Sequence, residues 1–253
     1  MINRVLLAGG IPRFVPLIPS VDGWRLNTDE LSRIDPQQVK AALLMSPSMP
    51  TGAVFNNDEW QALVDFCKLA DCWLINDSAM ERILFDNRPV IHPASFPNIH
   101  KKVITVGSAS KEYRMIGWRV GWVVGPAEII MDIARVSISN VVCQTGIAMG
   151  AVAAAINDPK DNIAECVAEW QTRRDIIINE LSDYNIIQPH GGWSFLIDVS
   201  ELGSDGSLAS KRLLELGNIV ATSMVNWGSE NSCLLYTSPS PRDRGCSRMP
   251  SSA

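Results

Sequence analysis

Residues 107–121, with the sequence GSASKEYRMIGWRVG, place an amine and a guanidinium among small side chains. Lys111 follows Ser108 and Ser110, and Arg119 comes eight positions later. Small residues let a backbone approach another group closely. The two cations therefore favour a neighbour or ligand that is anionic or electrophilic.

A carboxylate and a proline-rich turn also follow apolar runs that we expect to be strands. Asp77 comes just after the run 72–75, and the turn 46–52, SPSMPTG, comes after the run 41–45. In an open α/β sheet, ligands bind outside the carboxyl ends of the strands. We therefore expect Asp77, Lys111, the serine hydroxyls and the arginine to converge on one crevice.

Short apolar runs alternate with helical patterns in the first half of the chain. The expected strands are 14–18, 41–45, 72–75, 103–106 and 120–124, and most lack polar alternation, as in a parallel sheet covered on both faces. The clearest helix is 57–70, which follows an Asn that can cap its first turn and places Trp60, Leu63, Val64 and Cys67 on one face. The alternation predicts an α/β fold with a mostly parallel sheet flanked by helices.

The second half predicts helices and then a smaller α/β unit. Residues 126–157 are rich in Ile, Ala, Val and Met and favour long helices with a break near Ser139 and Asn140. Beyond them we expect a helix at 163–184, strands at 186–187 and 193–199, and a helix at 208–216. We divide the chain into a large domain (1–127), a connecting helical region (128–157) and a small C-terminal domain (158–233).

The last residues differ from the rest in composition. From position 236 the sequence YTSPSPRDRGCSRMPSSA loses periodicity and turns to Ser, Pro and Arg. We interpret 234–253 as a non-native tail that resembles translated vector sequence. A natural disordered tail is the alternative.

The composition disfavours several classes of protein. Lys and Arg total 22 against 27 Asp and Glu, a net charge of −5 that offers no broad basic face to nucleic acid. No apolar run approaches the ~18 residues that a membrane span needs. Six cysteines without CxxC spacing and three histidines favour free thiols in a reducing compartment and no metal site. We expect a cytoplasmic protein.

In their order and spacing, the three polar segments resemble motifs of the class I and II aminotransferases, a family of fold type I enzymes that use pyridoxal 5'-phosphate. Ser108–Lys111 with Gly117–Gly121 resembles the cofactor attachment motif. Ser46–Gly52 resembles the turn Asn-Pro-x-Asn-Pro-Thr-Gly, and Asp77–Asp86 (DSAMERILFD) resembles the Asp-Glu-x-Tyr segment. The similarity extends from about residue 1 to about residue 232 and implies the fold type I architecture and a homodimer.

The resemblance also implies roles for individual residues. Lys111 would form a Schiff base with the cofactor aldehyde and then move the substrate proton. Ser108, Ser110 and Arg119 would bind the phosphate, and Asp77 would keep the pyridine nitrogen protonated. The implied reaction is the transfer of an amino group between an amino acid and a 2-oxo acid. Without the resemblance, Asp77 is equally suited to capping a helix that begins at Ser78.

Some positions depart from the family pattern. Met49 and Met80 stand where the family has Asn and Tyr, which donate hydrogen bonds to the phenolic oxygen of the cofactor. Since a thioether cannot donate, we expect the imine formed by Lys111 to have a raised pKa compared with relatives. Arg114 replaces a residue that is usually small and would approach the phosphate or point to solvent.

Three family features are absent from the sequence. Relatives carry a phosphate turn and a ring-stacking aromatic residue before the position of Met1, and an Arg that grips the substrate carboxylate near their C-terminus. We therefore expect a fragment truncated at both ends with weak or no activity. No residue is assigned to the substrate. One alternative is another fold type I enzyme, such as a C–S lyase, which would share Lys111, Asp77 and Arg119 with an aminotransferase. The other is an inactive cofactor-binding fragment.

Overall fold

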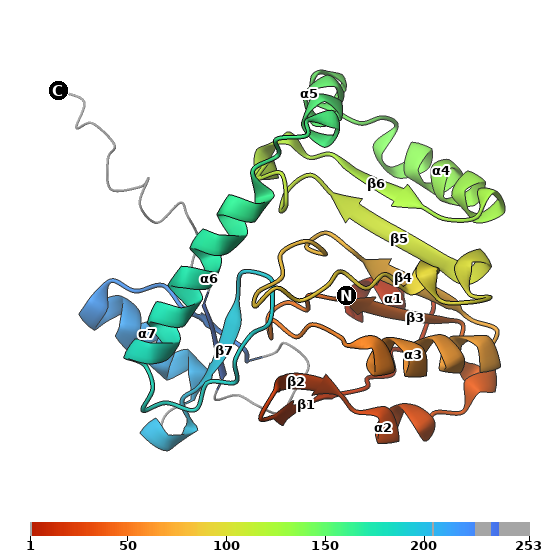
Figure 1. Cartoon of the computed structure of the whole chain (residues 1–253). Coiled ribbons are helices and arrows are strands. Elements are labelled where there is room, and N and C mark those ends of the chain that lie inside the picture. Colours follow the sequence, from red (N-terminus) through yellow and green to blue (C-terminus); the bar gives the residue numbers. More distant parts are fainter. Residues whose placement is uncertain (1, 204, 226–233, 238–253) are drawn as a thin grey trace.

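The computed structural model describes residues 2–203, 205–225 and 234–237 (Figure 1). Its largest sheet has the strand order β3-β4-β5-β6, with β3 (Ala41–Met45), β4 (Trp73–Asp77), β5 (Val103–Ser108) and β6 (Gly121–Val124). The β3/β4 and β4/β5 pairs are parallel, whereas β6 runs antiparallel to β5. The predicted α/β fold with a mostly parallel sheet is confirmed.

Helix α3 (Asn57–Leu69) covers one face of this sheet (Figure 1). Asn56 Oδ1 accepts a hydrogen bond from Glu59 N at 2.9 Å, and Glu59 Oε2 accepts one from Asn56 N at 2.8 Å. This capping box satisfies backbone donors at the start of the helix, and the predicted cap is therefore confirmed. The buried face of α3 packs with the sheet in one apolar cluster that includes Trp60, Leu63, Val64, Cys67, Leu74 and Val103.

The two faces of the sheet differ in burial. In β4, Leu74 and Asn76 are buried, whereas the alternate residues are half-buried. On β3, Leu43 is 42% exposed. In β5, however, the neighbouring residues Val103 and Ile104 point to opposite faces and are both buried. The expectation that both faces are covered therefore holds at the start of β5 and fails at β3.

The chain before β3 forms a separate antiparallel ribbon. Strand β1 (Leu17–Ser20) pairs with β2 (Gly23–Leu26) across a tight turn, and helix α2 (Thr28–Ser32) follows. The strand expected at 14–18 thus begins later and belongs to this ribbon, not to the parallel sheet. Glu59 ties the ribbon to α3, because its Oε1 accepts a hydrogen bond from Leu26 N at 2.6 Å.

The remaining helices are mostly exposed. They are α1 (Ile2–Leu7), α4 (Ala127–Val141), α5 (Gly146–Asn157), α6 (Ile163–Glu180) and α7 (Gly206–Gly217). Short 3-10 segments occur at Pro36–Gln38, Pro93–Ser95, His100–Lys102, Ile116–Trp118 and Ser200–Leu202. The break between α4 and α5 falls at 142–145, just after the predicted position, where Val142 has φ 67°. Among the described residues, none of these helices has the length and apolar character of a membrane span.

The C-terminal unit contains a small antiparallel sheet in the order β7-β9-β8. Its strands are β7 (Phe195–Asp198), β8 (Thr222–Ser223) and β9 (Leu234–Thr237), and the strand expected at 186–187 is reduced to one bridge between Ile186 and Ile197. Strand β9 occupies the first four residues of the segment interpreted as a tail; residues 238–253 lie outside the described residues. The domain boundaries stay predictions.

Backbone hydrogen bonds join the C-terminal unit to the first half of the chain. His190 N donates to Gly52 O at 2.8 Å, and Gly192 N donates to Ile83 O at 2.8 Å. A bridge between Leu84 and Gly191 lies beside them. The turn at 189–192 is therefore fixed against the segment that follows β4.

Candidate functional site

The predicted site residues lie where β4 and β5 end. Asp77 is the last residue of β4, and Ser108 is the last residue of β5. Because these strands are parallel, their carboxyl ends share one edge of the sheet, and Ser78 N donates to Val106 O at 2.9 Å to extend the pairing. Lys111 and Arg119 lie on the connection from β5 to β6 at the same edge.

This connection is a closed loop that brings Arg119 back to the serines. Ala109 N donates to Val120 O at 3.1 Å, which joins the two ends of the loop. Arg119 has left-handed backbone angles, φ 56° and ψ 42°. Its Nη1 donates to Ser110 Oγ at 3.4 Å and to Ile116 O at 2.9 Å. The loop thus gathers a guanidinium and a serine hydroxyl at one point.

Ser108 belongs to the same group. Its Oγ accepts a hydrogen bond from Ser110 N at 3.2 Å, so the two serines and Arg119 form one connected set. The glycines of the segment serve the pairing of β5 with β6: a Cβ on Gly121 would lie 2.7 Å from Gly107 O, and one on Gly107 would lie 2.1 Å from Trp122 Nε1. At these two positions the small residues admit a neighbouring strand and an indole.

Lys111 is half-buried, and its amine interacts with one negative and one positive side chain, Asp77 and Arg119. Burial lowers the pKa of its amine, Asp77 raises it and Arg119 lowers it, and the net result is a pKa below the usual value. Burial raises the pKa of Asp77, and the Ala79 N–H, at 3.1 Å from Oδ1, together with Lys111 offsets part of that rise. The residues after Asp77 form turns, so the bond to Ala79 caps no helix.

Trp193 is the site neighbour that the sequence did not indicate. Lys111 Nζ lies 4.3 Å from the centroid of its ring. Trp193 belongs to the C-terminal unit, 82 positions after Lys111, and the motifs contain nothing that links the two. The only local signal is the glycine turn that immediately precedes Trp193.

The three departures from the family pattern lie in different surroundings. Met80 is 1% exposed and packs in an apolar cluster that includes Trp193, whereas Met49 is 37% exposed. Arg114 donates to Glu112 O at 2.6 Å and to Asp161 O at 2.7 Å. Arg114 is exposed, which agrees with the second of its two expected positions, although its guanidinium bonds two backbone carbonyls and does not extend freely into solvent.

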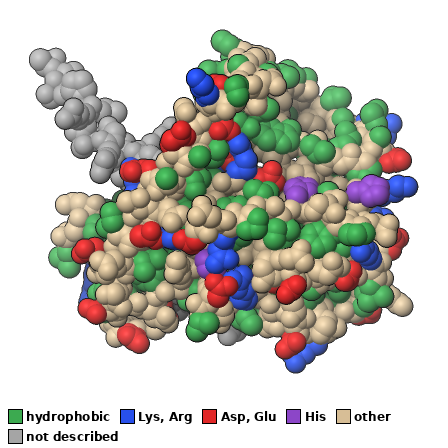
Figure 2. All heavy atoms as spheres, in the orientation of Figure 1, with side chains coloured by type: hydrophobic (Ala, Val, Ile, Leu, Met, Phe, Trp, Pro, Cys, Tyr) green, Lys and Arg blue, Asp and Glu red, His purple; other side chains and the backbone are tan. Residues whose placement is uncertain are grey.

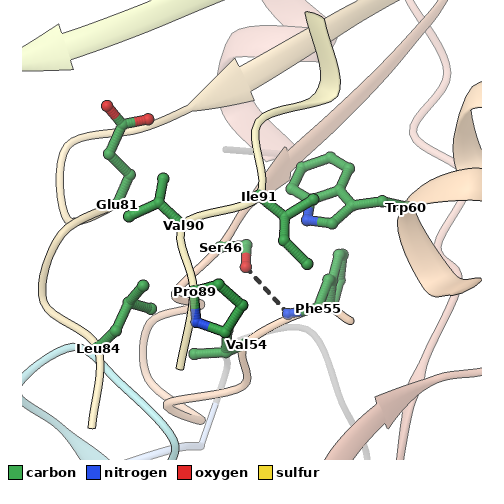
Figure 3. Close-up of a pocket in the computed structure, with 9 residues that line it drawn as sticks. All are labelled: Ser46, Val54, Phe55, Trp60, Glu81, Leu84, Pro89, Val90 and Ile91. Atoms are coloured by element: carbon green, nitrogen blue, oxygen red, sulfur yellow. Dashed lines mark hydrogen bonds between the residues drawn. The ribbon is translucent and has the colours of Figure 1, made fainter. Parts of the chain in front are cut away.

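The small cavity of Figure 3 is a packing gap and not a ligand site. It measures about 10 Å³ and lies between the 46–55 segment and residues 81–91, where Ser46 Oγ accepts a hydrogen bond from Phe55 N at 3.0 Å (Figure 3). That volume holds at most about one water molecule. A wider groove of about 320 Å³ lies between α2 and α3, which carry none of the predicted site residues. Among the described residues, no cluster of three or more side chains could bind a metal ion.

Comparisons with known proteins agree with the motifs. The family model for aminotransferase class I and II matches residues 1–233. The chain is 30% identical over 207 residues to an arginine–pyruvate transaminase of Pseudomonas aeruginosa, covering 80% of this chain and 52% of that protein. It is 31% identical over 227 residues to a probable aspartate/prephenate aminotransferase of Aquifex aeolicus, covering 86% and 57%. The chain spans about half the length of these curated relatives.

Solved structures show the same fold. An aromatic aminotransferase of Pyrococcus horikoshii superposes with a TM-score of 0.87 at 27% identity, covering 92% of this chain and 64% of that one. An N-succinyldiaminopimelate aminotransferase of Mycobacterium tuberculosis gives a TM-score of 0.85 at 26% identity, covering 92% and 62%. The sheet, the order of the motifs and these matches agree: the chain belongs to the aminotransferase class I and II family, whose members use pyridoxal phosphate.

Proposed function

We propose that the protein is a pyridoxal-phosphate-dependent aminotransferase that transfers an amino group between an amino acid and a 2-oxo acid. The observation that carries this proposal is the meeting of Lys111, Asp77 and the set of Ser108, Ser110 and Arg119 at one edge of the sheet. The named activities of the relatives, which include arginine–pyruvate and kynurenine–oxoglutarate transamination, support the same reaction class.

The residues present fit the cofactor. In the described part of the chain, Arg119 bonds a hydroxyl and a carbonyl and forms no ion pair with a carboxylate, so its charge is available to a phosphate. Ser108 and Ser110 stand beside it with hydroxyls that can donate. Asp77 is a partly buried carboxylate whose oxygen can accept the pyridine N–H. When bound, pyridoxal phosphate supplies an aldehyde and a ring that accepts electrons.

Each of these residues has a separate role in the proposed reaction. Lys111 attaches the cofactor and afterwards removes and returns the proton at the substrate Cα. Burial and Arg119 favour the neutral form of its amine, which is the form that acts as a nucleophile or base. Asp77 stabilises the protonated ring nitrogen, and Ser108, Ser110 and Arg119 hold the phosphate in place. Positioning of this kind lowers a barrier without any new bond.

Met80 favours a second candidate, a chain that binds the cofactor but turns over poorly. Its thioether is buried at the position where the family motif has a Tyr donor, and a thioether cannot donate a hydrogen bond. The same residues would still hold the cofactor. Activity and cofactor attachment must therefore be measured separately.

Attachment is tested by loading the chain with pyridoxal phosphate, reducing it with borohydride and mapping the labelled peptide. We expect the label on Lys111, its loss in Lys111→Ala, and no change in Lys102→Ala, which removes a lysine outside the site. A label on another lysine would contradict the proposal.

Turnover is tested by incubating the loaded chain with single amino acids and 2-oxoglutarate. Formation of glutamate and the matching 2-oxo acid supports transfer. Release of ammonia without glutamate would indicate a lyase, and attachment without either product would favour the second candidate.

We also propose that the protein works as a homodimer in the cytoplasm. Figure 2 shows hydrophobic side chains gathered over α4 and α5. The exposed ones include Met131, Val136, Ile138, Val141, Ile147 and Met149. A second copy would cover such a surface, and sedimentation of the chain at several concentrations tests this. The free thiols of Cys67, Cys72, Cys143 and Cys166 suit a reducing compartment.

A further inference from the structure

Trp193 contacts Lys111 through the face of its indole ring. The amine lies 4.3 Å from the ring centroid, which is within the range of a cation–π interaction. Such an interaction stabilises the ammonium form of Lys111 and contributes little to the stability of the neutral amine. The contact therefore acts on the same atom that the proposed function makes a nucleophile.

Both the indole ring of Trp193 and the backbone that precedes it are held by contacts. Trp170 of α6 is 1% exposed and meets Trp193 edge to face, with 6.2 Å between the ring centroids. The backbone just before Trp193 is also held, because Gly192 has φ +74° and its N–H donates to Ile83 O at 2.8 Å. A Cβ on Gly191 would lie 2.5 Å from Ile83 O, so a residue larger than glycine at position 191 would clash with the backbone that follows Asp77. The indole is thus fixed relative to the segment that follows Asp77.

We propose that Trp193 is a positioning residue for Lys111, holding the amine against its indole face at the carboxyl ends of β4 and β5 until the cofactor aldehyde takes it. The proposal rests on the proposed function for the identity of the aldehyde. The charged groups that act on Lys111 are Asp77, from β4, and Arg119, from the loop. Trp193 adds a third, uncharged influence from the C-terminal unit.

The chemical consequence follows from the step itself. The ammonium first loses a proton to solvent, the neutral amine attacks the aldehyde carbon, and the aldehyde oxygen leaves as water when the C=N bond forms. Because Trp193 stabilises the ammonium, it opposes the first of these events. Removing the indole should therefore make Lys111 reactive at lower pH.

The test compares the cofactor-free chain with Trp193→Phe and Trp193→Leu. Reaction of Lys111 with trinitrobenzenesulfonate is followed against pH by peptide mapping, and the same series is repeated with pyridoxal phosphate. We expect the pH midpoint of Trp193→Leu to fall by about half a unit, or about threefold faster labelling near neutral pH, with Trp193→Phe between it and the parent.

A matched control is Trp73→Leu, because Lys102 Nζ lies 5.3 Å from the Trp73 ring centroid in a similar pair outside the site. It should leave the midpoint of Lys111 unchanged. Equal midpoints for the parent and both Trp193 variants, with melting curves that show folded protein, would overturn the proposal. If Trp193→Leu fails to fold, Trp193→Phe decides. If trinitrobenzenesulfonate labels Lys111 but pyridoxal phosphate does not, the proposed function is contradicted. The pH midpoints of the trinitrobenzenesulfonate reaction still test the role of Trp193 in that case.

Discussion

Lys111 and Asp77 set each other's protonation at the residue scale. Both are half-buried, and desolvation penalises the charged form of each. Their mutual attraction works against that penalty. The pair is therefore sensitive to the loss of either charge.

We predict that Asp77→Asn lowers the pKa of Lys111 further, because the substitution removes the carboxylate that raises it. The pH dependence of trinitrobenzenesulfonate labelling measures this change. Asp65→Asn, on the exposed side of α3, serves as the control. An unchanged midpoint in Asp77→Asn would show that the two groups do not interact.

Met49 offers a way to test the missing donor without disturbing the core. It is 37% exposed, so Met49→Asn should fold normally. We predict that this variant lowers the pKa of the imine formed by Lys111, because an amide can donate to the phenolic oxygen and stabilise its charge. Titration of the visible absorption band measures it. A pKa equal to that of the parent would mean that Met49 does not reach this oxygen.

At the element scale, the first turn of α3 depends on Asn56 and Glu59. We predict that Asn56→Ala lowers the free energy of unfolding by about 1 kcal/mol, because one backbone donor loses its partner. For a chain of this size the melting temperature should fall by about 2–4 °C. Asn57→Ala changes an exposed neighbour and should have little effect. Equal losses in both variants would argue against the capping box.

The sequence was informative where an element carries its own signal. The apolar runs and the Asn cap located β3 to β6 and α3, because buried strands and helix starts are marked locally. The ribbon β1–β2 was misassigned, since an apolar run such as 14–18 does not reveal its pairing partner. The contact of Trp193 with Lys111 depends on tertiary packing across 82 positions and left no local pattern.

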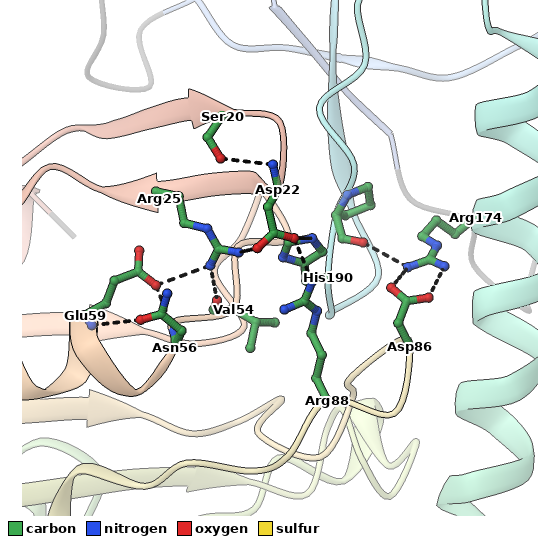
Figure 4. A network of polar contacts seen from close by, with 11 residues as sticks. Ser20, Asp22, Arg25, Val54, Asn56, Glu59, Asp86, Arg88, Arg174 and His190 are labelled. Atoms are coloured by element: carbon green, nitrogen blue, oxygen red, sulfur yellow. Dashed lines mark hydrogen bonds and ion pairs between the residues drawn. The ribbon is translucent and has the colours of Figure 1, made fainter.

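At the scale of the whole molecule, Arg174 links α6 to the segment after β4. Arg174 is 2% exposed, and its guanidinium binds both carboxylate oxygens of Asp86 at 2.7 Å (Figure 4). Nη1 also donates to Pro189 O at 3.2 Å, just before the turn that leads to Trp193. This ion pair therefore helps to fix the part of the chain that faces Lys111.

We predict that Arg174→Met lowers the free energy of unfolding by about 1–3 kcal/mol, because it removes charge-assisted hydrogen bonds to the partly exposed carboxylate of Asp86 and leaves Pro189 O without this donor. Chemical denaturation measures the loss. Arg173→Met, the neighbouring position that pairs with Glu169 on the helix surface, should cost under about 1 kcal/mol. Similar costs for the two variants would show that the pair with Asp86 adds no special stability.

His190 makes the folding stability of the protein depend on pH. Burial lowers the pKa of His190 to about 4, with Arg88 and Arg25 adding to the effect and Asp22 opposing it (Figure 4). The unfolded chain binds this proton near pH 6.5, so the folded state carries fewer protons between about pH 6.5 and 4. Stability is therefore complete above pH 6.5 and is lost as the pH falls through this window, by at most about 3 kcal/mol.

We predict that His190→Asn flattens the fall in stability between pH 6.5 and 4, because the variant has no proton to bind in that window. Urea unfolding at several pH values measures the slope. Asp22 and Asp86 have lowered pKa values and should keep a residual slope at lower pH. A parent and variant with identical slopes would mean that His190 is protonated in the folded state.

Strand β9 has a consequence for any shortened version of the chain. It lies between β7 and β8 and is the neighbour of both. Ending the polypeptide at residue 233 would remove the middle strand of this sheet, so that, within the residues that the structure describes, β7 would keep only the bridge between Ile186 and Ile197 and β8 would lose the strand with which it pairs. Since β7 begins two residues after Trp193, the lost strand pairing would lie close to the indole that faces the amine of Lys111.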